Sequence, residues 1–418
     1  MDQNLCFIDA FGPLPVIQPQ TVAELGDLVR RAAAENQAVY PLGGQTMLTY
    51  GLPPTRPGIG VNLRGLSRVI DYPARDMTVT VQAGITLAEL QELLRTENQR
   101  LPIDVPRADR ATLGGVLATN TSGPRRYGFG TLRDYVIGIS AVNDQGQDIK
   151  AGGRVVKNVA GYDLCKLYVG SLGTLGVITQ ATLKLRPRPE EQALLTLGCR
   201  AEAVGPLLDQ LHRSRTQPVC LDVLNGAAAR WVTRQTGIAL PDADWIVAVG
   251  FEDNREAVAW QVRQLIQELP AGQVPGLEAR VSHAAEPLWR GLVEFPHRPE
   301  ARLTIKANLL PSATAAFCLQ AAALPEAPLL HAHAGSGIVV GHVDADLTPD
   351  RARAMLKELQ DSAAAARGNV VILHCPAAWK TALPVWGAPR GDAWLMRSIK
   401  ERLDPRRLFN PGRFVDGI

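Results

Sequence analysis

Two spacings of apolar residues divide the first hundred residues into helices and strands. Apolar positions three and four residues apart predict helices over 22–35 and 87–98. A threonine precedes each helix, and a glutamate three residues later completes the spacing of a capping box. Short apolar or β-branched runs predict strands at 38–42, 68–72 and 77–83. This part of the chain therefore reads as a compact α/β unit.

The remaining pattern continues this unit and then changes character. A hairpin is expected over 135–151, a short helix at 164–169 and a strand at 177–185, and the Arg-Pro-Arg-Pro run at 186–189 predicts a domain boundary. Beyond it, strands are predicted at 193–198, 219–223, 245–251, 302–309, 331–342 and 369–374, and helices at 204–214, 255–268, 313–323, 352–366 and 394–403. This order predicts split βαβ units with helices on one face of an antiparallel sheet.

Composition narrows the class of protein. The 418 residues are 46% apolar, which suggests two or three domains, and 44 basic against 41 acidic residues give a net charge of +3. The charges are well mixed, so we expect neither nucleic-acid binding nor attraction to an anionic membrane. Six scattered cysteines without a CxxC motif argue against zinc, an iron–sulfur cluster or a disulfide framework in this chain. Without a signal peptide or an apolar run of about 18 residues, we expect a cytoplasmic protein with no direct membrane insertion.

Two loops are rich in residues that suit a ligand. Gly43 and Gly44 follow the strand at 38–42, where unobstructed amides could cradle pyrophosphate oxygens, although this loop alone is also typical of a turn. Thr112 would cap a short helix whose glycines keep one face small, and the polar run at 119–123 continues it. Packing alone would favour apolar bulk there, so we interpret this segment as ligand-binding. Arg125 and Arg126 follow and on their own are typical of solvated surface.

A third glycine-rich segment, KNVAGYDLCKLYVGSLGTLGVIT at 157–179, has glycines at 161, 170, 173 and 176. It is consistent with a tight helix-to-strand connection or with main chain lying against a phosphate-bearing or planar cofactor. The spacing is not that of a dinucleotide-binding GxGxxG motif. Considered with the loops at 41–46 and 111–128, it predicts a third backbone approach to one ligand.

Four ordered motifs carry a resemblance to a known family. They read PLGGQT at 41–46, ATLGGVLATNTSGPRRYG at 111–128 with RDYVIG at 133–138, VVKNVAGYDLCKLYVGSLGTLGVIT at 155–179, and LDPRRLFNPGR at 403–413. The chain thus resembles flavoproteins of the vanillyl-alcohol oxidase and para-cresol methylhydroxylase (PCMH) type, and within them the FAD-binding E subunits of bacterial glycolate oxidases. The resemblance implies an α+β fold: a FAD-binding PCMH-type domain of two α/β subdomains (1–189), a ferredoxin-like α+β cap domain (190–380) and a C-terminal segment (381–418) returning to the FAD domain.

The resemblance also implies positions for FAD. The pyrophosphate loop would be Gly43, Gly44, Gln45 and Thr46; the loop and helix against pyrophosphate and flavin would be Thr112, Leu113, Gly114, Gly115, Ala118, Thr119, Asn120, Ser122 and Gly123; the adenosine side would be Gly173, Thr174, Gly176, Val177 and Ile178; and Asn410 would lie near the ring. No histidine or cysteine occurs in 41–46 or 111–128, so we expect noncovalent FAD. Leu172 replaces an acidic residue common in the family.

The middle region is less similar to the family. Relatives that oxidise 2-hydroxy acids carry a HAGDGNLH-like metal motif, whereas the run from His331 to Val340 here keeps His333 but has Ser336 and Val340 at the other two ligand positions. We therefore expect no metal site. The remaining catalytic candidates are His333, His374 and Lys306; Lys306 stands where relatives place a substrate-binding lysine, but it is equally typical of a sheet-edge charge.

Three hypotheses about function follow from the resemblance. The first is an FAD-binding subunit of a glycolate oxidase complex that oxidises glycolate or D-lactate together with a catalytic flavin subunit and an iron–sulfur subunit. The second is a self-sufficient FAD oxidoreductase for another 2-hydroxy acid or alcohol, using Lys306, His333 and His374. The third is an accessory structural subunit without catalysis of its own. Fold alone does not separate them, because function belongs to the site.

Overall fold

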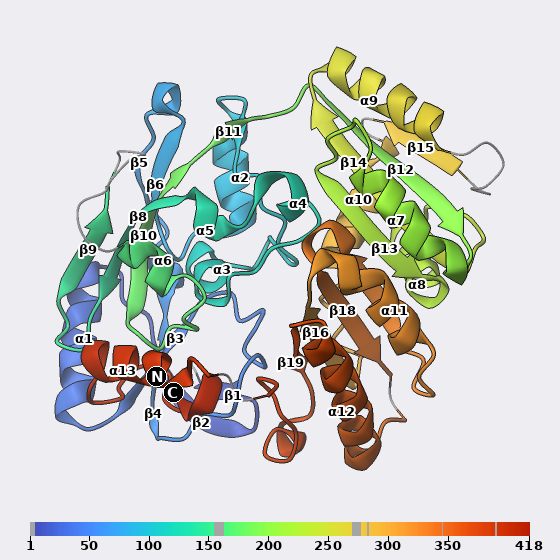
Figure 1. Ribbon diagram of the computed structural model, residues 1–418. Helices are drawn as coiled ribbons and strands as arrows, with labels where there is room; N and C mark the ends of the chain where they lie inside the picture. Colours follow the sequence, from blue (N-terminus) through green and yellow to red (C-terminus); the bar gives the residue numbers. More distant parts are fainter. Residues whose placement is uncertain (1–4, 154–162, 270–276, 282–283, 345, 389–390) are drawn as a thin grey trace. The chain divides into compact units, whose positions relative to one another are not determined.

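The computed structural model describes residues 5–153, 163–269, 277–281, 284–344, 346–388 and 391–418 (Figure 1). The residues at 157–162, the beginning of the third glycine-rich segment, lie outside this part. The chain forms two compact units: the first comprises 1–121, 131–188 and 389–418, and the second comprises 122–130 and 189–388. The short segment 122–130 thus belongs with the middle region, although it follows directly on a predicted FAD-binding helix.

The first unit contains two sheets. The four-stranded sheet has the order β1 (Leu5–Ile8), β2 (Phe11–Ile17), β4 (Gly58–Asn62), β3 (Ala38–Leu42), in which β4 runs parallel to β2 and β3. The five-stranded sheet is antiparallel, with the order β5 (Val69–Asp71), β6 (Thr78–Gln82), β10 (Val177–Lys184), β8 (Val136–Val142), β9 (Asp148–Gly152). Two short strands, β7 (Gln99–Arg100) and β11 (Arg186–Pro187), pair with each other.

Five helices of the first unit begin within one residue of the predicted positions: α1 (Val22–Ala34), α2 (Leu87–Arg95), α3 (Leu113–Thr119), α6 (Leu164–Tyr168) and α13 (Ala393–Leu403). The short helix α5 (Leu132–Tyr135) was not predicted. The capping box of α2 is complete: the Thr86 hydroxyl accepts from the Glu89 amide and the Glu89 carboxylate accepts from the Thr86 amide. In α1 the Thr21 hydroxyl accepts from the Glu24 amide, but the Glu24 carboxylate accepts from the amide of Gln20.

One core joins the parts of the first unit. Leu25 and Val29 of α1 are buried together with Val39 of β3, Val177 of β10 and Phe409 of the C-terminal segment. Complete burial of such a side chain stabilises the fold by about 1.5–3 kcal/mol. The cluster therefore holds three stretches that are far apart in the sequence.

The second unit is built on one eight-stranded antiparallel sheet; the middle-region pattern predicts an antiparallel sheet but only six of its strands. Its order is β15 (Leu277–Val281), β12 (Glu191–Cys199), β14 (Trp245–Asp253), β13 (Cys220–Asn225), β17 (Leu329–His333), β18 (Ile338–Val343), β16 (Leu303–Asn308), β19 (Asn369–His374). Its helices are α4 (Arg126–Phe129), α7 (Val204–His212), α8 (Gly226–Thr236), α9 (Arg255–Glu268), α10 (Glu286–Glu294), α11 (Thr314–Ala322) and α12 (Pro349–Ala365).

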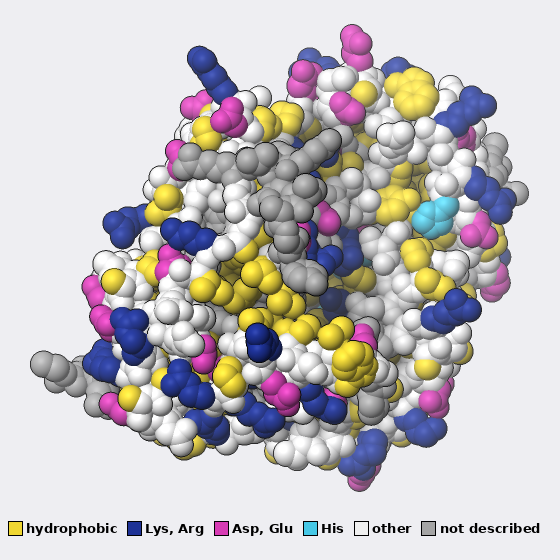
Figure 2. Space-filling model, turned by 60° about the vertical axis from the view of Figure 1, so that its left-hand side comes forward, with side chains coloured by type: hydrophobic (Ala, Val, Ile, Leu, Met, Phe, Trp, Pro, Cys, Tyr) yellow, Lys and Arg dark blue, Asp and Glu magenta, His cyan; other side chains and the backbone are white. Residues whose placement is uncertain are grey.

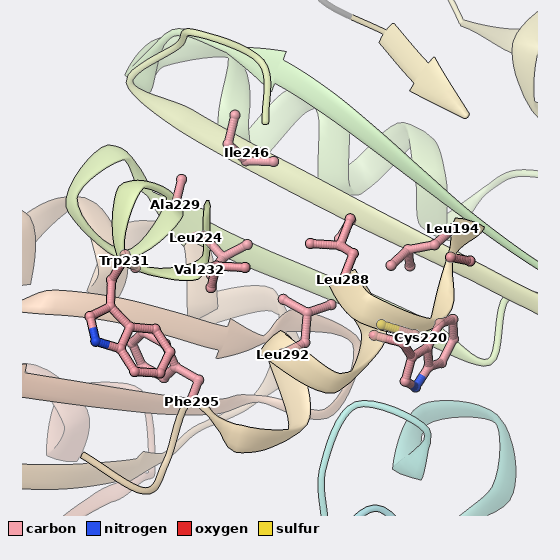
Figure 3. Packing of buried hydrophobic residues seen from close by; sticks show 14 of the residues in the cluster. Leu194, Cys220, Leu224, Ala229, Trp231, Val232, Ile246, Leu288, Leu292 and Phe295 are labelled. Atoms are coloured by element: carbon pink, nitrogen blue, oxygen red, sulfur yellow. The ribbon is translucent and has the colours of Figure 1, made fainter. Parts of the chain in front are cut away.

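The structure corrects two expectations for this unit. Residues 331–342 were expected as one strand, but β17 and β18 form a hairpin there, because Gly337 adopts a φ of +68° and reverses the chain. Helices α8 and α10 were not predicted. Both pack on the apolar side chains of the sheet, where Leu292 of α10 and Val232 of α8 share a buried cluster with Leu224 and Ile246 (Figure 3).

The surface agrees with the mixed charge of the sequence. In the face drawn in Figure 2, basic and acidic side chains lie interspersed, and neither sign gathers into a single field. Within the described residues, every helix is too short or too polar to span a bilayer.

Candidate functional site

The first predicted FAD loop requires glycine for steric reasons. A Cβ atom at Gly43 would lie 2.1 Å from the Thr112 hydroxyl oxygen, and one at Gly44 would lie 1.7 Å from the carbonyl oxygen of Arg110. The loop after β3 therefore packs against the segment that starts α3. Within the described chain, the amides of Gly43 and Gly44 donate to no protein acceptor, and both residues are half-buried. These two donors are available to an anionic ligand.

Helix α3 packs closely on the neighbouring backbone through its own glycine. The Thr112 hydroxyl caps the helix by accepting from the Gly115 amide at 3.3 Å, as predicted. The Gly114 amide donates to the carbonyl of Ala83 at 2.8 Å, and a Cβ at Gly114 would lie 2.9 Å from the Ala83 methyl group. The helix ends at Asn120 in a left-handed conformation with φ +50°.

The described part of the third glycine-rich segment lies against α3. The Leu172 amide donates to the carbonyl of Ala118 at 2.8 Å, and the Gly170 amide donates to Leu117 at 2.9 Å. Gly173 and Gly176 have φ values of +66° and +153°, which glycine adopts without strain. Beyond them Val177 and Ile178 enter β10, while Thr174 is buried and its hydroxyl donates to Ser171.

Asn410 connects the C-terminal segment to the same place. Its side-chain amide donates to the carbonyl of Leu172 at 2.7 Å, and its backbone amide donates to Val39 at 3.0 Å. A buried ion pair supports it: the Lys400 ammonium contacts Asp404 at 2.6 Å and donates to the carbonyls of Thr174 and Phe409. Sequence reasoning missed this pair, although its i,i+4 spacing on α13 was a visible signal.

The structure thus gathers most of the predicted FAD residues within the first unit. The loop at 43–46, helix α3, the segment 173–178 and Asn410 contact one another there. Ser122 and Gly123 begin the segment that belongs to the second unit. Within the described chain, the buried side-chain oxygens of Asn120 and Asn410 have no hydrogen-bond partner.

Segment 122–130 is fixed to the second unit by Arg125. Its guanidinium pairs with the buried carboxylate of Glu252 at 2.7 Å and lies over the ring of Trp289, 3.9 Å from the centroid. The Tyr127 ring leaves no space for a side chain at Gly335, because a Cβ there would lie 2.4 Å from it. Arg125 is therefore an anchor in the second unit, and not the solvated surface charge that its sequence alone suggests.

Lys306 lies half-buried on β16, opposite Val340 of β18 and Val371 of β19. Burial, with a smaller contribution from the positive charge of Arg126, lowers the pKa of its ammonium group to about 8. Among the described residues, no carboxylate pairs with Lys306. A negative charge beside Lys306 would stabilise its ammonium form.

Two histidines of β17 share one carboxylate. Nε2 of His331 lies 2.7 Å from Oδ2 of Asp222, and Nδ1 of His333 lies 3.0 Å from both carboxylate oxygens. Burial would raise the pKa of Asp222, but the two imidazoles outweigh burial, so the pKa lies well below its usual value. Burial lowers the pKa of His331, partly opposed by Asp222. Asp222 was not predicted, because 109 residues separate it from His331 and no local motif marks it.

The third predicted catalytic residue stands apart from this group. His374 ends β19 opposite Thr304 of β16. The Thr304 hydroxyl lies 2.9 Å from Nδ1 of His342, whose other ring nitrogen lies 2.8 Å from the carbonyl oxygen of Phe295. Lys306, His333 and His374 therefore occur on strands of one sheet, with β16 paired to β19 and separated from β17 by β18.

Comparison with solved structures defines the class of fold. 4-Ethylphenol oxidase from Gulosibacter chungangensis superposes with a TM-score of 0.74 over 98% of this chain and 90% of that protein, at 14% identity. p-Cresol methylhydroxylase with substrate bound superposes with a TM-score of 0.70 over 95% and 88%, also at 14% identity. The predicted PCMH-type α+β fold is thereby confirmed.

Family models and relatives then place the chain more closely. Residues 13–152 match a FAD binding domain, and residues 188–414 match the C-terminal domain of FAD linked oxidases. The chain belongs to the FAD-linked oxidase family; it is an oxidoreductase, and FAD is its cofactor.

Three relatives show how far the similarity extends. Glycolate oxidase subunit GlcE of Escherichia coli strain K12 is 31% identical over 61% of this chain and 71% of that protein. D-2-hydroxyglutarate dehydrogenase of Xanthomonas citri is 28% identical over 97% and 89%. Glycolate oxidase subunit GlcD of Bacillus subtilis is 30% identical over 55% of this chain, a match that spans about half of that subunit, 49%.

The donors of the first unit fit the cofactor that this family uses. The amides of Gly43 and Gly44, which donate to no acceptor in the described chain, suit pyrophosphate oxygens. The unpartnered oxygens of Asn120 and Asn410 suit hydroxyl or N–H donors of a bound molecule.

Proposed function

We propose that this chain is the FAD-binding subunit of a glycolate oxidase-type complex that oxidises a small 2-hydroxy acid. The observation that carries the proposal is Lys306, half-buried beside Arg126 with no carboxylate partner among the described residues. A substrate carboxylate would supply the missing negative charge. The similarity to 2-hydroxy-acid dehydrogenases and glycolate oxidase subunits supports the same substrate class.

In this proposal, each group of residues has a separate task. FAD, when bound, accepts a hydride from the substrate carbon. Gly43 and Gly44 hold the pyrophosphate through their amides, while Lys306 and Arg126 bind and orient the carboxylate. The hydroxyl proton requires a base.

We assign proton acceptance to His374. Strand β19 pairs directly with β16, which carries Lys306, whereas β17 with His331 and His333 lies two strands from β16, about 10 Å in the sheet. A 2-hydroxy acid places its hydroxyl next to its carboxylate, so the base belongs near the lysine.

Partners and flavin attachment belong to the same proposal. The six cysteines are buried and scattered along the sequence, which does not suit cluster binding by this chain. In this proposal, electrons pass to an iron–sulfur cluster on another subunit. Catalysis would be shared with a second flavin subunit. We infer noncovalent FAD because the predicted FAD loops at 41–46 and 111–128 contain no histidine or cysteine. Acid precipitation tests this inference: FAD should appear in the supernatant, and a yellow pellet would contradict it.

Anaerobic reduction tests the function. Glycolate, D-lactate and D-2-hydroxyglutarate are added separately to the FAD-loaded chain, alone and in its purified native complex. Loss of visible flavin absorbance in the complex but not in the chain supports a subunit that needs its partners. Loss in the isolated chain would replace this proposal with that of a self-sufficient oxidoreductase. No loss in either preparation with any acid would contradict the substrate class.

A further inference from the structure

A buried group of three side chains in the second unit has a geometry of its own. Strand β13 pairs with β17 so that Asp222 lies directly opposite His333, and His331 is two residues earlier on the same face of the sheet. The nearest nitrogen of each ring lies 2.7–3.0 Å from a carboxylate oxygen. One ligand atom from each residue can be chosen so that all three lie within 4.8 Å of one another.

Two imidazole nitrogens and one carboxylate oxygen form a donor set that suits a divalent transition metal. Zinc binds such atoms at about 2.0–2.2 Å, and a tetrahedral arrangement separates neighbouring ligand atoms by about 3.3 Å. The separations between Asp222 and the two rings, 2.7 and 3.0 Å, are shorter than this, and the widest separation allowed within the set, 4.8 Å, is longer. Binding of the ion would therefore move the carboxylate away from the rings and bring the most widely separated ligand atoms closer together.

The surroundings of the group favour a cation. Asp222 and His331 are fully buried, and His333 is 3% exposed. Phe295 packs edge-on against His331 with ring centroids 5.1 Å apart, and Trp231 packs on Phe295 within the apolar cluster of Figure 3. Apart from the two imidazoles, no basic side chain pairs with Asp222 among the described residues. A buried carboxylate is costly unless a positive charge balances it, and a divalent ion supplies that charge.

We propose that Asp222, His331 and His333 bind one divalent transition-metal ion, with zinc as the ion whose ligand preference matches best. This ligand set differs from the motif considered in the sequence, in which Ser336 and Val340 stand at two of the ligand positions. Asp222 comes instead from a strand far away in the chain. Three protein ligands leave a fourth coordination position for water or another small ligand. The proposal is independent of which hydroxy acid is oxidised.

Metal content tests the proposal without reference to activity. The FAD-loaded chain is dialysed against zinc, desalted and analysed by mass spectrometry for metal per chain; a second sample is stripped with a chelator and titrated with Co²⁺. We expect one zinc per chain and visible d–d absorption from cobalt in a site of low symmetry. The D222N variant should lose more than the about 10- to 100-fold in affinity that removal of an outer-shell partner costs, because it removes a ligand charge.

His342→Asn is the matched control. His342 is equally buried in the same sheet and is hydrogen-bonded to Thr304 and Phe295, so its loss disturbs packing to a similar degree without touching the three ligands. It should retain the zinc. A wild-type chain that stays metal-free and shows no cobalt bands would overturn the proposal even if D222N fails to fold. Equal zinc in wild type and a folded D222N would also overturn it, leaving the three residues as a hydrogen-bonded group.

Discussion

The two units build their sites from different materials. In the first unit, the backbone forms the site: Gly43, Gly44 and Gly114 permit segments to approach within distances that no Cβ would allow, and the amides of Gly43 and Gly44 donate to no acceptor in the described chain. In the second unit, charged side chains from distant parts of the chain interact: the charge of Arg126 on α4 lowers the pKa of Lys306 on β16, and Asp222 of β13 pairs with His331 of β17. The backbone site of the first unit is therefore encoded by short stretches of sequence, whereas the side-chain groups of the second unit depend on how distant segments pack.

Replacement of a glycine in the first unit should give the largest effect, because it disrupts the backbone contacts of the predicted FAD site. In Gly44→Val, the new side chain would overlap the carbonyl of Arg110, since even a Cβ lies 1.7 Å from it. We expect loss of bound FAD, measured by the flavin absorbance of the purified protein, with the second unit still folded by circular dichroism. Gly153→Ala is the control, because nothing lies within 4 Å of its Cβ. Stoichiometric FAD in Gly44→Val would contradict a backbone-defined site.

Replacement of Arg125, which anchors segment 122–130, should give the next largest effect, a loss of stability. Arg125→Met leaves the buried carboxylate of Glu252 without the guanidinium, and removal of one partner of a buried pair costs about 3–5 kcal/mol. The midpoint of urea unfolding should fall accordingly. Arg353→Met removes an exposed pair with Asp350 and should cost under about 0.5 kcal/mol. Equal midpoints for both variants would show that Arg125 is not an anchor.

Replacement of Lys306 should affect substrate binding and leave FAD in place. Hydrogen bonds to charged groups contribute about 1.5–3 kcal/mol, so Lys306→Met should raise the KM for the 2-hydroxy acid by about 10- to 100-fold. Steady-state kinetics of the native complex measure this. Lys357→Met, in an exposed pair on α12, is the matched control and should leave KM unchanged. A KM that is unchanged in Lys306→Met would show that Lys306 does not bind the substrate.

Substrate binding should also depend on pH in a defined direction. The pKa of Lys306 is about 8, so its ammonium is charged below that pH and loses its proton above it. The carboxylate stays ionised throughout this range. KM should therefore be flat below about pH 8 and rise by about tenfold per unit above it, while Lys306→Met shows no such rise. A KM that decreases above pH 8 would contradict the conclusion that a positively charged Lys306 binds the substrate.

The smallest effect tests local structure in the first unit. Thr86→Ala removes the hydroxyl that caps α2 and should cost about 1 kcal/mol of stability, seen in thermal or urea unfolding. FAD content should not change. A cost well above 2 kcal/mol would indicate that the capping box supports more than its helix.

Sequence patterns predicted most helices and the five-stranded sheet of the first unit, because the signals of these elements are local, but they missed β1, β2 and β4 of the four-stranded sheet. Capping residues, strand runs and positive-φ glycines such as Gly173 and Gly176 each act within a few residues of their position. The patterns failed at the β17–β18 hairpin, where a continuous apolar run concealed the reversal at Gly337. They also missed α8 and α10, whose packing is decided by the sheet beneath them.

The side-chain groups of the second unit could not be predicted from spacing. Arg125 and Glu252 are 127 residues apart, and Asp222 and His333 are 111 residues apart. Only the register of β13 against β17 brings the latter pair together. Lys306 was identified through the family resemblance. The influence of Arg126 on Lys306 could not be predicted, because it depends on segment 122–130 belonging to the second unit.

The most direct test of the central claim compares two substrates that differ by one carboxylate. The FAD-loaded native complex is reduced anaerobically with glycolate or with ethylene glycol, in wild type and in Lys306→Met. We expect rapid flavin reduction by glycolate in wild type, and half-saturation at about 10- to 100-fold higher glycolate concentration in Lys306→Met. Ethylene glycol should reduce the flavin little in either protein. Equal glycolate dependence in the two proteins, or equal reduction by the two alcohols, would contradict the claim.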